Sequence, residues 1–105
     1  MNTSIGVRNP RTGKIDDWIT PPTIEDLTAQ CQRLRHAQED WQQRGLAARI
    51  EALQQWKQAV QANRDELIEA LVADTGRLEV SILEVDSFLG SLDRWCRLAP
   101  ELLQP

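Results

Sequence analysis

The triplet Asp74-Thr75-Gly76 is the most suggestive chemical motif of this 105-residue sequence. An Asp-Thr-Gly triplet is the signature of aspartic proteases, in which two such carboxylates share one proton, and a chain of this length suits a protease that dimerises to supply the second one. That motif needs flanking strands, whereas residues 66–74 have helical periodicity. The favoured interpretation is therefore a helix end closed by Gly76, because glycine readily adopts the left-handed conformation.

The two cysteines and the single histidine are the remaining candidates for nucleophile, base or metal ligand. Cys31 and Cys96 fall on apolar helical stripes, where a buried cysteine is usually an inert small side chain. Neither has a second Cys or a His at ligand spacing, so no metal site is predicted. His36 lies beside its stripe, and a catalytic base also needs a nucleophile and an orienting group. We expect no catalytic residue among the three.

Two acidic residues and the four tryptophans are the remaining candidates for a binding site. Glu84 and Asp86 are two residues apart on a predicted helix, so they point to different sides and cannot clamp one ligand. Four tryptophans are present, namely Trp18, Trp41, Trp56 and Trp95. Aromatic residues at helical spacing usually belong to a core, so we expect three of them to anchor helices and one to cover a hairpin.

The composition excludes several classes of function. There are 16 acidic and 12 basic residues, and the net charge of −4 argues against a nucleic-acid partner or an anionic membrane surface. No apolar run is long enough to span a bilayer, and no signal-peptide pattern is present. Two cysteines are too few for a disulfide framework, which favours a reducing, cytoplasmic location. The length allows one small domain at most.

A short β-hairpin is predicted at the N-terminal end, over residues 4–19. Apolar residues are two apart over residues 4–8, as in a strand with one buried face. Residues 9–13 read Asn-Pro-Arg-Thr-Gly, which is dense turn chemistry. A second short strand follows with Ile15 and Trp18 as its apolar marks. Two strands alone are marginal in water, so this hairpin needs a surface to lie on.

The rest of the sequence has helical periodicity. A first helix is expected over 23–44, with Thr23 and Asp26 as a capping box. Residues 46–74 form either one broken helix or two helices that meet near Asn63, an expected N-cap. These elements predict a mainly α fold with the N-terminal hairpin and three or four antiparallel helices.

The last predicted helix covers residues 78–99, and Pro100 marks its end. Its apolar residues, including Ile82, Val85 and Leu89, lie on one face.

Taken in order, these marks resemble the N-terminal segment of the aldehyde dehydrogenases, from Asn9 to about Ala99. The sequence Asn-Pro-x-Thr-Gly-Lys at residues 9–14 looks like the family's hairpin turn, and Asn-Arg-Asp-Glu-Leu at 63–67 like its Asn/Arg-x-Asp-Glu-Leu step. Asp-Thr-Gly-Arg at 74–77 is similar to its Glu-Thr-Gly-Lys. Arg94-Trp95 stands where the family often has Tyr-Tyr, and Arg97 replaces the glycine that usually follows.

The resemblance implies the N-terminal part of an α/β fold whose helices pack against a dinucleotide-binding sheet. Such an enzyme oxidises an aldehyde to a carboxylic acid with NAD or NADP, using a cysteine thiolate, an oxyanion hole and a glutamate that activates water. In the family those residues lie downstream of the matched segment, and neither Cys96 nor Glu84 corresponds to them. We therefore expect an inactive N-terminal fragment that has no catalytic residue and binds no cofactor by itself.

The resemblance also suggests a substrate-tunnel position and a partner. By position, Leu83 and Ser87 are candidates for lining the aldehyde entrance tunnel, whereas simple helix packing is the favoured interpretation. The expected partner is the remainder of the dehydrogenase, and bare apolar helix faces predict self-association of the fragment. The alternative function is a stand-alone helical protein-interaction module, which would be monodisperse and melt cooperatively.

Overall fold

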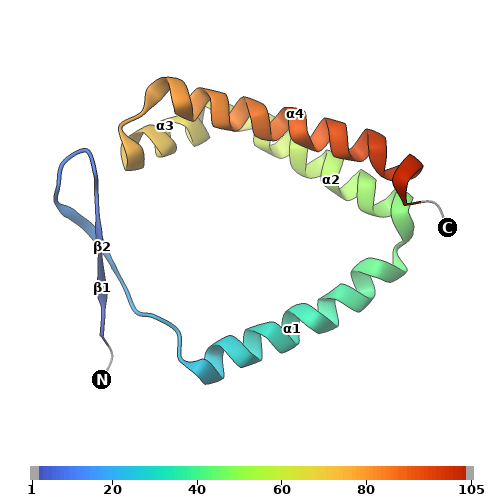
Figure 1. Ribbon diagram of the computed structural model, residues 1–105, viewed down its shortest axis with the longest axis horizontal. Helices are drawn as coiled ribbons and strands as arrows, with labels where there is room; N and C mark the ends of the chain where they lie inside the picture. Colours follow the sequence, from blue (N-terminus) through green and yellow to red (C-terminus); the bar gives the residue numbers. More distant parts are fainter. Residues whose placement is uncertain (1–2, 104–105) are drawn as a thin grey trace. The chain divides into compact units, whose positions relative to one another are not determined.

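The computed structural model describes residues 3–103, and the chain divides into two compact units between Gln43 and Arg44. The first unit contains two strands and a helix: β1 (Ile5–Arg8), β2 (Ile15–Ile19) and α1 (Ile24–Gln43). The second unit contains three helices: α2 (Gly45–Ala62), α3 (Arg64–Thr75) and α4 (Leu78–Leu102) (Figure 1). The predicted fold class, mainly α with an N-terminal hairpin, is confirmed.

The two strands of the first unit form an antiparallel hairpin. Ile5 lies opposite Ile19, and a bulge interrupts the register between Val7 and Arg8. The apolar side chains of both strands, including Trp18, are largely exposed among the described residues. The alternation at residues 4–8 therefore predicted the strand, but no described residue of either strand is buried.

One asparagine organises the turn between the strands. The backbone N–H of Asn9 donates to the carbonyl of Lys14 (2.8 Å), and its side-chain oxygen accepts the N–H of Arg11 (2.9 Å). Its side-chain amide donates to the carboxylate of Asp16 (2.6 Å). Gly13 has a φ of 72°. This left-handed value strongly favours glycine. Because Asn9 is buried and fully engaged, the turn is fixed by local contacts.

Helix α1 begins at the predicted capping box. The N–H of Thr23 donates to the carboxylate of Asp26 (3.0 Å), and the N–H of Asp26 donates to the hydroxyl of Thr23 (3.1 Å). This reciprocal pair is the capping box that the spacing predicts. The backbone bond, followed by the bond from the hydroxyl, holds the pKa of Asp26 below its usual value. No residue of α1 is buried, so its apolar stripe is bare within the described residues.

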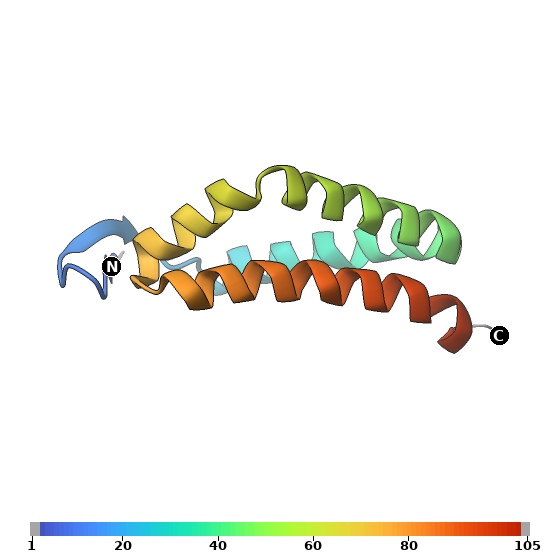
Figure 2. The ribbon, with the colours of Figure 1, turned by 90° about the horizontal axis from the view of Figure 1, so that it is seen from above.

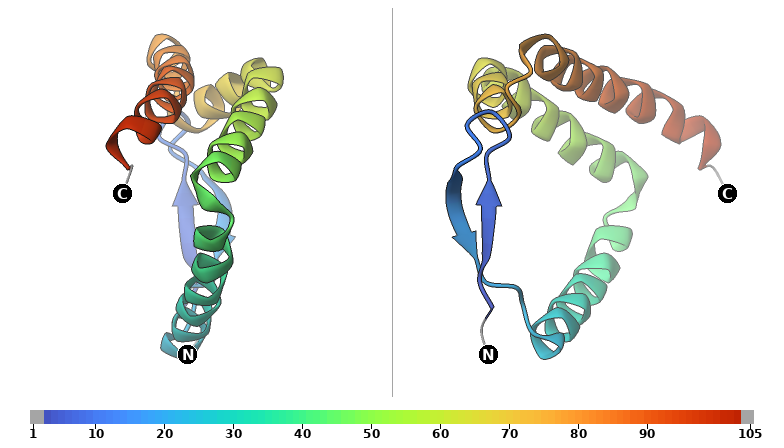
Figure 3. Two further views of the ribbon diagram at one scale, coloured as in Figure 1. Left: turned by 90° about the vertical axis from the view of Figure 1, so that its right-hand side faces the viewer. Right: turned by 60° about the vertical axis from the view of Figure 1, so that its left-hand side comes forward.

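In the second unit, α4 runs antiparallel to α2 and α3 and lies against both (Figures 2 and 3). Two ion pairs join these helices in reverse order along the chain, as antiparallel helices require. The Lys57 ammonium contacts the carboxylate of Asp93 at 2.6 Å, and Arg64 contacts that of Asp86 at 2.7 Å. The pairs therefore set the register of α4 on α2 and α3.

The Arg64–Asp86 pair is the more specific of the two contacts. The guanidinium donates through Nε (2.7 Å) and Nη2 (2.9 Å) to the two carboxylate oxygens. This geometry is bidentate, which fixes direction as well as distance. The hydrogen bonds lower the pKa of Asp86 and raise the pKa of Arg64. Both groups remain partly solvated, so the pair contributes more to orientation than to stability.

The apolar core of the second unit is thin. Among the described residues, the buried hydrophobic side chains are Ile68 (8% exposed) and Val85 (6%). The expectation that tryptophans anchor the helices is wrong for Trp56 and Trp95, which are exposed. A short chain buries little surface, and here the helices meet along a single seam.

The junctions between helices explain where the predicted long helix divides. Asn63 ends α2: its side-chain amide donates to the carbonyl of Ala59 (2.8 Å), and it makes no capping bond to α3. The expectation of a side-chain N-cap at this residue is therefore wrong. Gly76 closes α3 with a φ of 70°, and its N–H donates to the carbonyl of Val72 (2.7 Å). This is the left-handed helix end predicted for the glycine.

Helix α4 continues past the expected end at Ala99, since Pro100 lies inside its last turn. The φ of proline suits a helix, but its missing N–H removes one backbone bond and its ring crowds the carbonyl four residues earlier. Within residues 3–103, no helix is long and apolar enough to cross a bilayer.

Gly90 provides a test of how much α4 depends on intrinsic helix propensity. It lies in the middle of α4, is exposed, and a Cβ built there meets no atom within 4 Å. Gly90→Ala should therefore stabilise α4 by about 1 kcal/mol. The measurement is the helical circular dichroism of the chain during thermal melting. A lower melting temperature would show that the position is occupied after all.

Candidate functional site

The residues predicted to line a substrate tunnel lie on the outer side of α4. Ser81 and Val85 are buried against the neighbouring helices. Leu83 and Ser87 each follow two residues later, which on a helix places them on the opposite side, and both are exposed. The Leu83 side chain is 64% exposed, so the described residues leave most of its surface uncovered.

Leu83 and Ser87 can shape a surface but cannot perform chemistry. They are one turn apart on the same side of the helix, so they form a short strip of one alkyl group and one hydroxyl. Gly90 is three residues further on and exposed, which leaves the strip flat at that end. Neither side chain is an acid or a base, so the strip itself has no group that activates the Ser87 hydroxyl.

A groove lies between α2, α3 and α4 in the second unit. It has a volume of about 370 Å³, and its lining consists of one carboxylate and six apolar side chains: Glu84, Trp56, Val60, Leu67, Leu71, Val85 and Phe88. The rings of Trp56 and Phe88 have centroids 5.1 Å apart and planes at 72°. This edge-to-face contact is a favourable aromatic arrangement. We call this feature the α2–α4 groove.

The sequence missed this groove for a definable reason. Trp56 is expected to anchor a helix because it lies at helical spacing, and Val60, Leu67 and Leu71 continue the apolar periodicity of the same segment. Periodicity identifies the apolar side of a helix, but it does not tell whether another element covers it. In the structure these side chains line an open concavity instead of a filled core.

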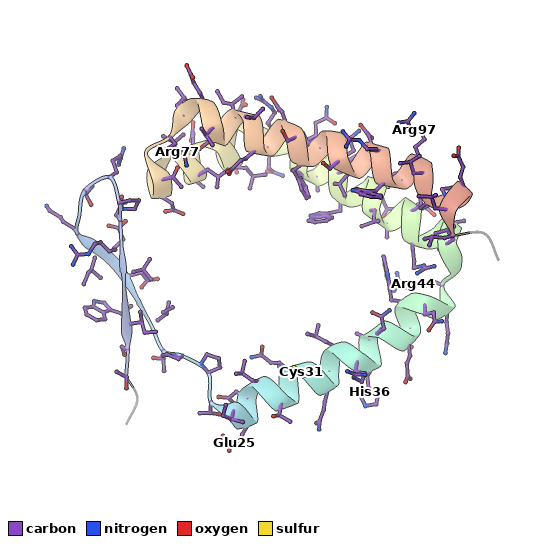
Figure 4. All side chains as sticks on the ribbon, in the orientation of Figure 1. Glu25, Cys31, His36, Arg44, Arg77 and Arg97 are labelled. Carbon is purple, nitrogen blue, oxygen red and sulfur yellow. The ribbon has the colours of Figure 1, made fainter. Side chains whose placement is uncertain are left out.

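The cysteines and the histidine occupy different surroundings from those expected. Cys31 is exposed on α1, beside Leu34 and Arg35, so its assignment to a buried core is wrong; Cys96 on α4 is partly exposed. His36 is exposed on α1 as well (Figure 4). Among residues 3–103, no three His, Cys, Asp or Glu side chains are grouped to hold a metal ion.

The acidic candidates carry no shared site. Asp74 precedes the helix end that Gly76 closes, and the hydroxyl of Thr75 donates back to the carbonyl of Leu71 (2.6 Å). The triplet is therefore part of a helix terminus, which excludes the protease geometry. Glu84 lines the α2–α4 groove, whereas Asp86 is engaged by Arg64, so these two carboxylates serve different surfaces.

A comparison with protein families decides what this helical arrangement belongs to. The sequence profile of the aldehyde dehydrogenase family matches residues 1–104. The chain belongs to the aldehyde dehydrogenase family. The resemblance seen in the hairpin turn, the Asn-Arg-Asp-Glu-Leu step and the Asp-Thr-Gly-Arg segment is thereby confirmed.

Curated relatives and a solved aldehyde dehydrogenase structure match the chain over most of its length. A Mycobacterium ulcerans protein provisionally named succinate-semialdehyde dehydrogenase (NADP+) 2 is 30% identical over 95 residues, covering 90% of this chain and 18% of its own length. The 3,6-anhydro-alpha-L-galactose dehydrogenase of Vibrio sp. strain EJY3 is 33% identical over 101 residues, covering 81% and 21%. The structure described as the provisional aldehyde dehydrogenase PutA from Anabaena variabilis is 60% identical, with a TM-score of 0.92.

The match covers a limited part of these aldehyde dehydrogenases. The similarity extends over 97% of this chain but 22% of the PutA chain, so the chain spans about one fifth of the length of the relatives it matches. The structure thus defines the hairpin and the helices of that portion.

The different exposure of the two cysteines gives a direct test of the structure. Cys31 should react with a maleimide several-fold faster than Cys96, because its thiol is exposed and that of Cys96 is partly covered. Mass spectrometry of tryptic peptides after timed labelling measures both rates, and Cys31→Ser identifies the fast site. Faster labelling of Cys96 would contradict the described arrangement of α4.

Proposed function

We propose that this chain is the N-terminal structural segment of a dehydrogenase that oxidises an aldehyde to a carboxylic acid with NAD or NADP. The observation that carries the proposal is the 60% identity to PutA across 97% of the chain, with the same backbone course. Names of two relatives include NADP+, which supports a nicotinamide dinucleotide as the oxidant. Identity at this level over the whole segment supports an equivalent role.

The chain's own residues supply a scaffold and not a reaction centre. The sequence has five glycines and no Gly-rich turn of the kind that cradles a pyrophosphate, so its residues do not fit the dinucleotide. The carboxylate of Asp86 is bound by Arg64, so it holds α4 against α3 and is not available as a base. We therefore assign cofactor binding and catalysis to the remainder of the enzyme. We propose that the whole enzyme is located in the cytoplasm.

The exposed apolar surface supports this assignment over an independent interaction module. A stand-alone module would need a core of its own, and the second unit buries only Ile68 and Val85 among its described apolar side chains. We propose that the remainder of the dehydrogenase covers the bare faces. Without it, the same faces should drive self-association of the chain.

A chimeric enzyme tests the proposed function. This chain replaces the matched segment of Anabaena PutA, and the chimera is assayed with aldehydes and NAD or NADP by the near-ultraviolet absorbance of the reduced cofactor. The two segments are 60% identical. We therefore expect turnover within about tenfold of the parent enzyme.

Two controls accompany the chimera. The chain alone, incubated with the same aldehydes and cofactors, should produce no reduced cofactor. A folded chimera without activity, beside an active parent, would contradict the proposed function. Turnover by the chain alone would contradict the assignment of catalysis to the remainder.

We further propose that Leu83 and Ser87 border the path by which the aldehyde reaches the reaction centre. Both are exposed on one strip of α4, and no described side chain covers Leu83. Both side chains are uncharged, which suits passage of a neutral aldehyde without holding it. This placement rests on their position in the family together with their exposure.

Enlarging Ser87 tests this placement. In the active chimera, Ser87→Phe should raise the KM for a bulky aldehyde roughly tenfold while leaving the kcat and the KM for a small aldehyde nearly unchanged. The matched control is Ala70→Phe, at an exposed position of α3 outside the strip and the groove. Equal effects on both aldehydes would show that Ser87 only packs against another element.

A further inference from the structure

One edge of α4 carries both ion pairs that join it to the other helices. Asp86 and Asp93 are about two helical turns apart, so they lie on the same side of α4. Their partners are Arg64, the first residue of α3, and Lys57 of α2. Helix α4 is therefore held along this edge at two levels.

Asp86 lies between the buried side of α4 and its exposed strip. Val85, the residue before it, is 6% exposed and faces the neighbouring helices, whereas Ser87, the residue after it, belongs to the exposed strip with Leu83. Successive residues of a helix are rotated by about 100°, so Asp86 occupies the edge of the seam that is next to the strip. Around the helix, the contact with Arg64 is thus closer to the strip than the buried contact of Val85.

The buried contacts alone fix the rotation of α4 about its own axis only weakly. Apolar contact is non-directional, and the buried apolar side chains among the described residues are Ile68 and Val85. Helical side chains reach about 5 Å from the helix axis, so a rotation of about 20° would move the tip of Leu83 by about 2 Å. The bidentate contact of Arg64 with Asp86 opposes such a rotation, because both hydrogen bonds would lose their geometry together.

The other charged contacts near this edge are less suited to fixing the rotation. Lys57 offers an ammonium with rotatable donors, and its partner Asp93 has a side chain that is 64% exposed. Asp65 contacts the same guanidinium at 3.3 Å, but it lies on α3 beside Arg64 and does not join two helices. The Arg64–Asp86 pair is therefore the contact with the most defined direction.

We propose that the Arg64–Asp86 pair is a positioning element that determines specificity, because it fixes the rotation of α4 and thereby places Leu83 and Ser87 beside the path of the aldehyde. This inference rests on the proposed function. Neither charged residue touches the aldehyde, and both act through the strip. A strip that rotates sweeps out more space than a fixed one, so loss of the pair obstructs a bulky aldehyde more than a small one.

Kinetics of the chimera test the proposal. Asp86→Asn should raise the KM for a bulky aldehyde about threefold, while the kcat and the KM for a small aldehyde stay nearly unchanged. Arg64→Lys should have a similar effect, since an ammonium keeps the charge but not the bidentate contact. The matched control is Asp65→Asn, which removes the same charge beside the same guanidinium. It should leave both KM values within about 1.5-fold of the parent values.

Spin labels measure the position of α4 without any turnover. One label is attached through Ser87→Cys on α4 and the other through Ala70→Cys, at an exposed position of α3. The labelled chimera has its other reactive cysteines replaced by serine. Double electron–electron resonance should show a distribution of label distances that Asp86→Asn broadens by about 2 Å. Asp65→Asn should leave the distribution unchanged.

The outcomes separate this proposal from the proposed function. An inactive parent chimera contradicts the function, and the label distances still decide whether the pair holds α4. An unchanged distribution in Asp86→Asn overturns the proposal, as does a KM for the bulky aldehyde that changes no more than in Asp65→Asn. Equal changes for the small and the bulky aldehyde also overturn it, because the pair would then support the segment as a whole and not its strip.

Discussion

The second unit depends on one seam, where α4 lies antiparallel against α2 and α3. Two ion pairs fix the register of this seam, and Ile68 and Val85 supply the buried apolar contact. Solvated ion pairs orient helices but add little free energy, and two buried side chains add only a few kcal/mol. The seam therefore fixes how α4 lies on α2 and α3, but it contributes little to the stability of the unit. Most apolar side chains outside the seam remain partly or largely exposed.

The features that the sequence predicted are those decided by contacts between near neighbours. The capping box of Thr23 and Asp26, the turn around Asn9 and the left-handed end at Gly76 each involve residues a few positions apart. Backbone conformation and local hydrogen bonds settle such features, so residue type and spacing are sufficient evidence. The turn at residues 9–14 and the segment 74–77 are also among the motifs that carry the family resemblance.

The features that the sequence did not predict depend on what lies across from a residue. Cys31 and Trp56 fall on apolar stripes and were assigned to a core, yet both are exposed. An apolar stripe shows that one face of a helix is apolar. Whether that face is buried depends on the elements that pack against it. The α2–α4 groove was missed for the same reason, since its lining comes from three helices at once.

The turn at Asn9 has a consequence for the order of events during synthesis. All the hydrogen-bond partners described for its side chain and N–H lie between Arg11 and Asp16, so the hairpin can take its register once those residues have left the ribosome. Hairpins form within microseconds, far faster than translation adds residues. Because two strands alone are marginal in water, the nascent hairpin gains lasting stability only when another surface covers its exposed apolar side chains.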